Sequence, residues 1–241
     1  LVVNMLGLGL WPTLIAVLSP RPSLMTPGRL VSFFFDLNQG AIVGLPVAML
    51  LLVAQLTATD RLRWLPHVMA ALLFSVAMAI PSLATVNWNS GASGMMRYAV
   101  WGGMPLLYLA LVYLQRLPRW PLALVAAILL VQAGAVKFAR SYDYLEFSPA
   151  ARFMLARFPA LYAPELEIFI ERTLHQDGAV HADVVAAYPS FEHPVKILFK
   201  ADSRKAHTNL CGAGGQVGLD HARGGWIYLD GPPTCIKGAH D

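Results

Sequence analysis

Five hydrophobic segments separated by short polar loops occupy the first 138 residues. They run approximately over 1–19, 41–58, 65–85, 98–115 and 120–138. Each approaches the roughly 20 residues that an α-helix, rising about 1.5 Å per residue, needs to cross the hydrocarbon core of a bilayer. Inside lipid, backbone polar groups must find partners within the protein, which favours helices. The pattern therefore predicts five transmembrane helices over residues 1–138.

The pattern changes from residue 139 onward, where long apolar runs stop and charged residues appear throughout. Ser148 followed by Pro149 is typical of a helix start, with an N-cap and then a proline at the first helical position. This helix should end before Pro159, and a second should begin at Pro164. We therefore expect residues 139–241 to form a separate domain.

Two stretches of this domain alternate as strands do. They cover residues 195–200 and 225–230, with a glycine-rich stretch at 212–218 between them that predicts a flexible loop. The fold class expected from the whole pattern is an α-helical polytopic membrane protein with a small C-terminal α+β domain.

The composition favours lipid as the solvent of the first half. Of 241 residues, 56% are hydrophobic and 13% are charged, and the mean hydropathy is +0.53. A soluble domain carries roughly 25% charged residues. Buried helices of a large soluble protein are the alternative, which five such segments disfavour. The net charge of +4 is spread along the chain without a run of Lys and Arg, so nucleic acid is not an expected partner.

Arginines near the helix ends indicate the orientation. The compact loops at 57–64 and 115–120 hold two arginines each, which predicts a cytoplasmic location. The opposite loops, 20–40 and 86–97, and the C-terminal domain would then lie outside the cytoplasm. Loop 20–40 also holds two arginines, so the asymmetry is modest.

The two cysteines of the chain, Cys211 and Cys235, both lie in the C-terminal domain. Such a pair suits a disulfide in an oxidising compartment, and two unrelated buried thiols are the alternative. Neither cysteine belongs to a CxxC pair, and the histidines of this domain are irregularly spaced, as solvated surface histidines are. No metal site and no cofactor are therefore predicted.

Two polar segments adjoin predicted membrane helices at the outer side. One reads Phe-Phe-Phe-Asp-Leu-Asn-Gln-Gly over 33–40 and contains Asp36 and Gln39. The other reads Asn-Trp-Asn-Ser-Gly-Ala-Ser-Gly-Met-Met-Arg-Tyr over 87–98 and contains Trp88, Arg97 and Tyr98. Polar groups at membrane depth are costly and often functional, so these five residues are the candidate substrate-binding residues.

These segments resemble motifs of large polytopic membrane glycosyltransferases of the GT-C class. In that class a short polar turn ending in glycine precedes a proline-containing helix, and a later W-x-x-G-x-x-x-G-x-R-Y-like stretch lies at the mouth of another helix. The stretch from Phe158 to Glu165 also resembles the start of the outer domain in such proteins. The resemblance implies transfer of a sugar from a polyprenyl-phosphate donor at the outer face.

The catalytic acid of that class has no identified counterpart here. The family would place it in the first outer loop near the N-terminus of the full protein, whereas the carboxylates of the membrane half are Asp36 and Asp60, and Asp60 falls on the predicted cytoplasmic side. We therefore expect the chain, which begins at Leu1 without a methionine, to be the C-terminal portion of a longer protein. The catalytic residue stays unknown.

Each candidate residue has two interpretations. Arg97 offers a planar fork of donors that matches a lipid-linked phosphate, or it extends to ordinary lipid phosphates. Trp88 and Tyr98 could stack on a sugar or mark the headgroup level. Asp36 could accept a bond from a sugar hydroxyl or cap the next helix.

Two other functions remain open. The main one is a non-catalytic membrane protein whose outer domain binds a partner or an envelope polymer. A transporter is disfavoured, because the apolar segments hold almost no ionisable group at mid-membrane. The resemblance favours a bacterial inner membrane with the C-terminal domain in the periplasm.

Overall fold

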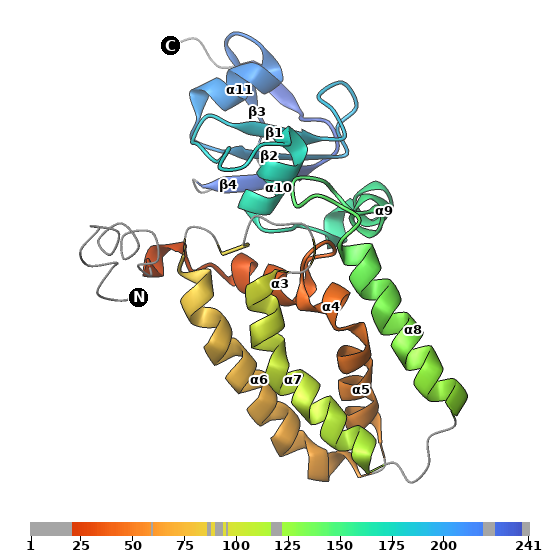
Figure 1. Cartoon of the computed structure of the whole chain (residues 1–241). Coiled ribbons are helices and arrows are strands. Elements are labelled where there is room, and N and C mark those ends of the chain that lie inside the picture. Colours follow the sequence, from red (N-terminus) through yellow and green to blue (C-terminus); the bar gives the residue numbers. More distant parts are fainter. Residues whose placement is uncertain are drawn as a thin grey trace, which may run out of the picture. The chain divides into compact units, whose positions relative to one another are not determined.

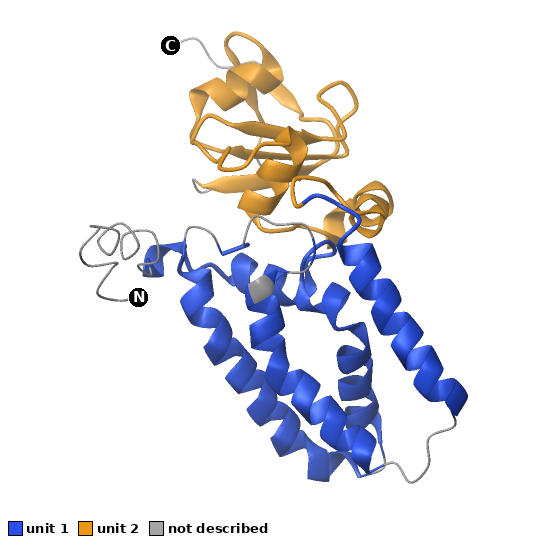
Figure 2. Cartoon of the chain, in the orientation of Figure 1, with its two compact units in different colours: residues 1–143 blue, residues 144–241 orange. Residues whose placement is uncertain are grey.

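The chain divides into two compact units, Leu1–Asp143 and Tyr144–Asp241 (Figure 2). The sequence pattern placed this division at residue 139. The computed structural model describes residues 21–58, 60–85, 88–89, 94, 96–116, 122–218 and 225–237. The first predicted segment, 1–19, lies outside them.

The first unit is helical (Figure 1). Its described elements are η1 (Pro22–Leu24), α3 (Pro27–Phe35), α4 (Ala41–Gly44), α5 (Pro46–Thr57), α6 (Arg61–Leu83), α7 (Arg97–Gln115) and α8 (Leu122–Ala139). Within the described residues, three helices are long and apolar enough to cross a membrane, namely α6, the Tyr98–Gln115 part of α7, and α8. These correspond to the predicted segments 65–85, 98–115 and 120–138, and their length and composition indicate a membrane protein.

The predicted segment 41–58 is divided into α4 and α5. Pro46 cannot donate a backbone hydrogen bond, and the residue before a proline is disfavoured in the helical region. Leu45 accordingly has φ −127° and ψ 46°. At 12 residues α5 extends about 18 Å, less than the roughly 30 Å of a hydrocarbon core. The side-chain amide of Gln132 in α8 donates a hydrogen bond to the carbonyl of Gly44 at this break.

Helices α6 and α7 pack side by side, and glycines on α7 permit close approach of other elements (Figure 1). A Cβ at Gly102 would lie 2.7 Å from Cε1 of the fully buried Phe33 in α3. At Gly103 it would lie 2.6 Å from Cδ1 of Leu45. Any larger residue would therefore displace a neighbour.

The second unit is a small α+β domain (Figures 1 and 2). Its elements are α9 (Pro149–Arg157), η2 (Pro159–Leu161), α10 (Leu166–Leu174), β1 (Val185–Tyr188), β2 (Lys196–Lys200), α11 (Arg204–Cys211), β3 (Gly215–Val217), β4 (Trp226–Asp230) and β5 (Cys235–Lys237). One antiparallel sheet has the order β1-β2-β4, with Ile197 opposite Ala187 and Leu229. A second sheet pairs β3 with β5.

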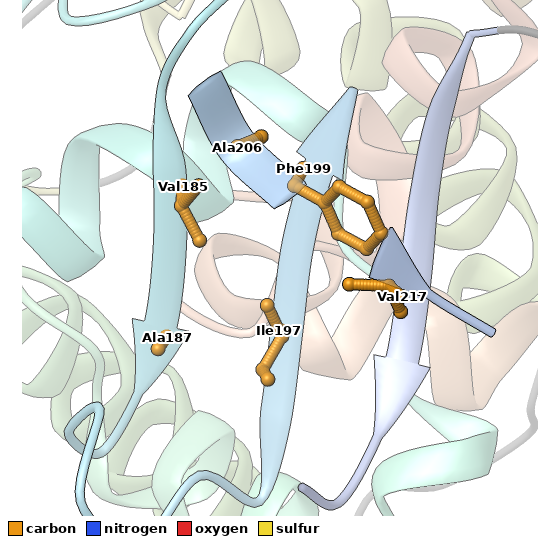
Figure 3. Packing of buried hydrophobic residues seen from close by; sticks show 6 residues of the cluster. All are labelled: Val185, Ala187, Ile197, Phe199, Ala206 and Val217. Atoms are coloured by element: carbon orange, nitrogen blue, oxygen red, sulfur yellow. The ribbon is translucent and has the colours of Figure 1, made fainter. Parts of the chain in front are cut away.

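Alternation along the strands gives the three-stranded sheet two buried faces. Val185, Ala187, Ile197 and Phe199 point to one face, where they meet Ala206 of α11 and Val217 of β3 (Figure 3). The other face is covered by α10, whose Phe169 ring lies 5.2 Å from the ring of Tyr228 in β4. Helices on both faces explain why β2 is buried along most of its length.

The local sequence signals in this unit are confirmed in part. Ser148 caps α9 by accepting a hydrogen bond from the backbone N–H of Ala151 at 3.2 Å, and α9 ends at Arg157. The two predicted strands appear as β2 and β4. The second helix begins at Leu166 rather than at Pro164. The stretch 212–218 differs from expectation, because residues 215–217 pair with β5 instead of forming only a flexible loop.

The two cysteines lie at disulfide distance. Cys211 ends α11 and Cys235 begins β5, with 1.96 Å between their sulfur atoms and 5.6 Å between their Cα atoms. Such a link would tie the helix to the small β3-β5 sheet.

Candidate functional site

The polar turn after α3 is organised by the carboxylate of Asp36. Its Oδ1 accepts hydrogen bonds from the backbone N–H groups of Asn38 at 3.0 Å and Gln39 at 2.8 Å, an Asx-type turn. A Cβ at Gly40 would lie 2.5 Å from the backbone nitrogen of Asp36, so the turn requires glycine there. Asp36 and Gln39 are both 2% exposed. The geometry thus gives Asp36 a role in closing the turn that precedes α4.

Arg29 in α3 reaches the end of α6. Its Nη1 donates hydrogen bonds to the carbonyls of Leu83 at 2.8 Å and Thr85 at 2.9 Å. The last carbonyls of a helix lack intrahelical donors and carry the negative end of the helix dipole, so a guanidinium stabilises them. The Cζ of Arg29 also lies 5.2 Å from the ring centre of Trp88, which is fully buried. Trp88 therefore packs against a protein cation.

The two polar segments that carry the resemblance meet at this end of the helices. The backbone N–H of Met96 donates a 3.0 Å hydrogen bond to the carbonyl of Gln39. Tyr98 is half-buried in the first turn of α7, with its ring 5.5 Å from that of Trp101. Arg97 begins α7, and its side chain lies outside what the structure describes. Of the five candidate residues, Asp36, Gln39 and Trp88 are thus buried within the protein.

Arg29 is the residue of this cluster that the sequence analysis did not identify. It was counted only as one charge of loop 20–40. Its partner carbonyls lie 54 and 56 residues further along the chain. Nothing in the local sequence indicates such partners.

The opposite end of the helical unit carries its own polar cluster. The indole of Trp64 donates to Asp60 at 3.1 Å, and its ring lies 5.4 Å from that of Tyr113. The guanidinium of Arg116 stands 4.9 Å from the centre of the same indole. The residues flanking the second and fourth predicted segments therefore lie at one shared end of the unit.

The C-terminal unit contains a pocket of about 340 Å³. Its wall includes the charged or aromatic residues Glu146, Phe147, Arg152, Arg172, His175 and Tyr188. Phe147 is buried beneath it, with its ring 5.0 Å from Tyr188 and 5.8 Å from Phe169. This pocket was not predicted from the sequence, because its residues come from or adjoin α9, α10 and β1, and none of these segments carries a recognisable binding motif.

Two of these side chains are fixed by backbone carbonyls. Arg172 is 1% exposed, and its Nε donates to the carbonyl of Tyr144 at 3.1 Å. His175 ends α10 in the left-handed region at φ 54°, and its Nδ1 lies 3.0 Å from the carbonyl of Leu145. A carbonyl only accepts, so Nδ1 carries the hydrogen. Burial raises the pKa of Tyr188, and the positive charge of Arg152 opposes that rise, which indicates that Arg152 acts on the phenol.

The same unit holds a buried carboxyl near the end of α10. Burial raises the pKa of Glu171 from its ordinary value of 4.5 to about 7. The backbone N–H of Gly178, which donates to the carboxylate at 2.9 Å, opposes this rise, whereas the charges of Glu167 and Asp177 add to it. The carboxyl is therefore stabilised in its neutral form by the fold.

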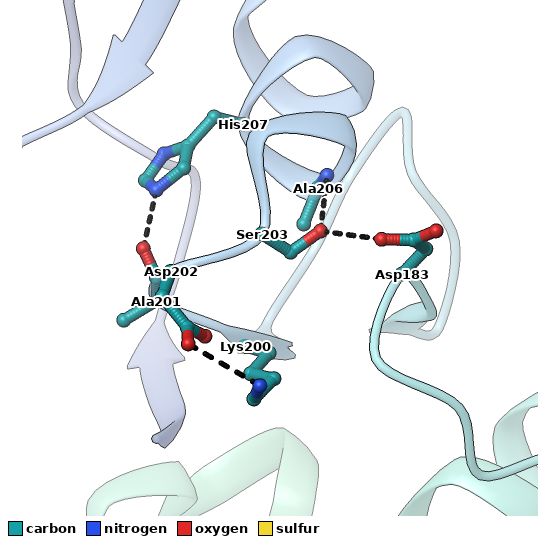
Figure 4. Close-up of polar contacts among 7 residues, drawn as sticks. All are labelled: Asp183, Lys200, Ala201, Asp202, Ser203, Ala206 and His207. Carbon is teal, nitrogen blue, oxygen red and sulfur yellow. Dashed lines mark hydrogen bonds and ion pairs between the residues drawn. The ribbon is translucent and has the colours of Figure 1, made fainter. Parts of the chain in front are cut away.

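The polar contacts at the start of α11 are structural (Figure 4). Ser203 accepts from the N–H of Ala206 at 3.2 Å and donates to Asp183 at 2.9 Å. His207 was expected to be a solvated surface residue, but it is half-buried. One ring nitrogen lies 2.7 Å from the carbonyl of Ala201, and the other accepts from the N–H of Val217 at 3.0 Å. Both nitrogens are thus used in joining α11 to its neighbours.

Among the residues that the structure describes, no group of three or more His, Cys, Asp or Glu side chains could hold a metal ion. Comparisons with protein families, with curated proteins and with solved structures found no match to this chain.

Proposed function

We propose that this chain is an integral membrane protein related to the GT-C glycosyltransferases, which binds a polyprenyl-phosphate-linked sugar at the outer face. The supporting observation is the hydrogen bond between Met96 and Gln39, which brings together the two segments that resemble motifs of that class. These segments are far apart in sequence, so their contact supports a common site at this end of the helices.

Within this proposal the residues divide into two roles. Asp36, Gln39 and Trp88 are buried and shape the site, while Arg97 and Tyr98 begin α7 beside it. A guanidinium at Arg97 would supply the planar donors that a phosphate requires.

We further propose that the C-terminal unit and the Asp36 turn lie outside the cytoplasm, in a bacterial periplasm. Two observations support this. The cysteine pair lies at disulfide distance, as expected in an oxidising compartment. The arginine-bearing loops next to α6 and α7 share the opposite end of the helical unit, as the positive-inside rule would require of cytoplasmic loops.

The alternative is a non-catalytic membrane protein whose outer domain binds a partner or an envelope polymer. The occurrence of a charged pocket wholly within the C-terminal unit favours it, because that unit could then bind a ligand by itself.

Binding of the donor tests the proposal without requiring the catalytic acid. The protein in nanodiscs would be titrated with a short-chain polyprenyl-phosphate glucose. We expect saturable binding that Arg97→Ala weakens about tenfold or more, the loss expected for a hydrogen-bonded charge pair. Arg63→Ala, an exposed arginine near the start of α6, is the matched control and should leave binding unchanged. Absence of saturable binding would favour the non-catalytic alternative, and equal effects of both variants would contradict the role of Arg97.

A further inference from the structure

The pocket of the C-terminal unit has the size of a small-molecule site. Its volume of about 340 Å³ lies within the roughly 300–1,000 Å³ range of ligand pockets and is larger than a bare inorganic anion requires. Its floor is aromatic, since Phe147 packs edge-to-face against Tyr188. A ligand of monosaccharide size would fit this space.

The charges of the pocket favour an anion. Two arginines, Arg152 and Arg172, and one carboxylate, Glu146, line the pocket, so the formal charge of these three groups is positive. Arg172 is held in place through Tyr144, whereas Arg152 is exposed on α9. A guanidinium matches phosphate and carboxylate oxygens through paired hydrogen bonds.

The remaining polar groups suit an organic ligand with hydroxyl groups. Glu146 is exposed and offers carboxylate oxygens, which accept hydrogen bonds from hydroxyls. The Tyr188 hydroxyl and the His175 ring add further polar positions on the wall. These groups add hydrogen-bonding positions that a ligand carrying hydroxyl groups can use and that a wholly apolar ligand cannot.

We propose that this pocket binds a small organic anion of monosaccharide size, bearing a phosphate or carboxylate group, with Arg152 contacting the anionic group. The site lies within the C-terminal unit and does not depend on the proposed glycosyltransferase activity. The anion-site proposal can therefore be right even if the chain does not bind the polyprenyl-phosphate donor, and wrong even if the chain does bind it.

The test is a titration of the full 241-residue chain in nanodiscs of a zwitterionic lipid. The probes are glucose 1-phosphate, glucuronate and, as the neutral comparison, glucose. We expect saturable binding of at least one anion, at least tenfold tighter than glucose. Arg152→Ala should weaken the binding about tenfold or more, and Tyr188→Phe, which keeps the packing ring, should weaken it several-fold.

Arg157→Ala is the matched control, because Arg157 is exposed on the same helix but does not line the pocket. It should bind as the unmodified protein does. Glu146→Gln removes the opposing charge and should preserve or strengthen anion binding. The proposal is overturned if neither anion binds more tightly than glucose, or if Arg157→Ala reduces binding as much as Arg152→Ala.

A further arm distinguishes the source of the anion. The titration is repeated in nanodiscs containing phosphatidylglycerol. Competition by this lipid would identify a lipid headgroup as the source of the bound anion, and unchanged affinity would identify a free anion. Both results support an anion site, provided that the Arg152 dependence is retained.

Discussion

Replacement of Arg29 should separate the polar turn after α3 from the end of α6. Its guanidinium donates to two carbonyls at 2.8 and 2.9 Å and lies 5.2 Å from the centre of the Trp88 indole. Arg29→Met retains much of the apolar stem and removes all three interactions. The exposed Arg21, eight positions earlier in the chain, provides the control Arg21→Met.

The magnitude follows from the contacts. A hydrogen bond from a charged donor contributes about 1.5–3 kcal/mol, and a cation over an aromatic ring adds about 0.5–2 kcal/mol. These terms share one side chain and are not additive. Removal of the donor leaves two carbonyl acceptors at the end of α6 unsatisfied, at about 1–3 kcal/mol each, and we take about 3 kcal/mol as the expected loss for Arg29→Met. At about 2–4 °C per kcal/mol for a protein of this size, the melting temperature should fall by roughly 10 °C.

Thermal unfolding followed by circular dichroism at 222 nm in a mild detergent measures this change. Arg21→Met should stay within about 0.5 kcal/mol of the unmodified protein. Arg29→Lys keeps the positive charge but loses the planar guanidinium, so its melting temperature should lie between those of Arg29→Met and Arg21→Met. If Arg29→Met melts like Arg21→Met, the assignment of Arg29 as the link between α3 and α6 is wrong.

Four further predictions concern other parts of the fold. Gln132→Leu should destabilise the helical unit by about 0.6–1.7 kcal/mol in a denaturant titration, because it breaks the bond at the α4–α5 break. In the same titration, Gln55→Leu should leave the free energy of unfolding unchanged or raise it, because the buried Oε1 of Gln55 has no partner among the described residues. A larger loss of stability for Gln55→Leu than for Gln132→Leu would contradict this. Gly102→Ala should lower the free energy of unfolding by about 1–3 kcal/mol, because the new methyl group would contact the buried ring of Phe33. Gly134→Ala, in open space on α8, should raise it by about 0.5–1 kcal/mol. Equal melting temperatures for the two variants would contradict the close packing at Gly102. Burial raises the pKa of Glu171 to about 7, so its neutral form stabilises the folded protein. This contribution to the free energy of unfolding, at most about 3 kcal/mol, should be complete below about pH 4.5 and lost as the pH rises through 7. Thermal melts from pH 4 to 8 should show this dependence, and Glu171→Gln should remove it.

Local signals in the sequence were sufficient for the elements whose determinants are local. The apolar runs predicted α6, α7 and α8, because their length and composition alone decide whether a helix suits lipid. Ser148 and Pro149 predicted the start of α9, because a cap involves only neighbouring residues. Alternation likewise predicted β2 and β4.

Elements that depend on distant partners were not predicted. Helix α11 has few apolar positions and is held by Ser203 and His207 contacts with other segments. Strand β3 is short and glycine-rich, and its pairing partner lies about twenty residues away. The break before Pro46 was also missed as a division of the helix, although proline is the local cause.

The candidate sites show the same limit. The residue types in the two polar segments indicated where to look, and the segments do meet in the structure. Their burial could not be inferred, because it depends on Arg29 and on the packing of α3 against α6. The pocket of the C-terminal unit draws on four separate segments, so no sequence window contains it.

The proposed donor site and the cysteine link both require that the C-terminal unit lie on the outer side of the membrane. The chain's two cysteines, Cys211 and Cys235, both lie in that unit, so a thiol label reports on it alone. Intact spheroplasts would be treated with a membrane-impermeant reductant and then with an impermeant maleimide. We predict labelling of both cysteines without permeabilisation, and none when the reductant is omitted. Labelling only after permeabilisation would place the unit in the cytoplasm and contradict the account.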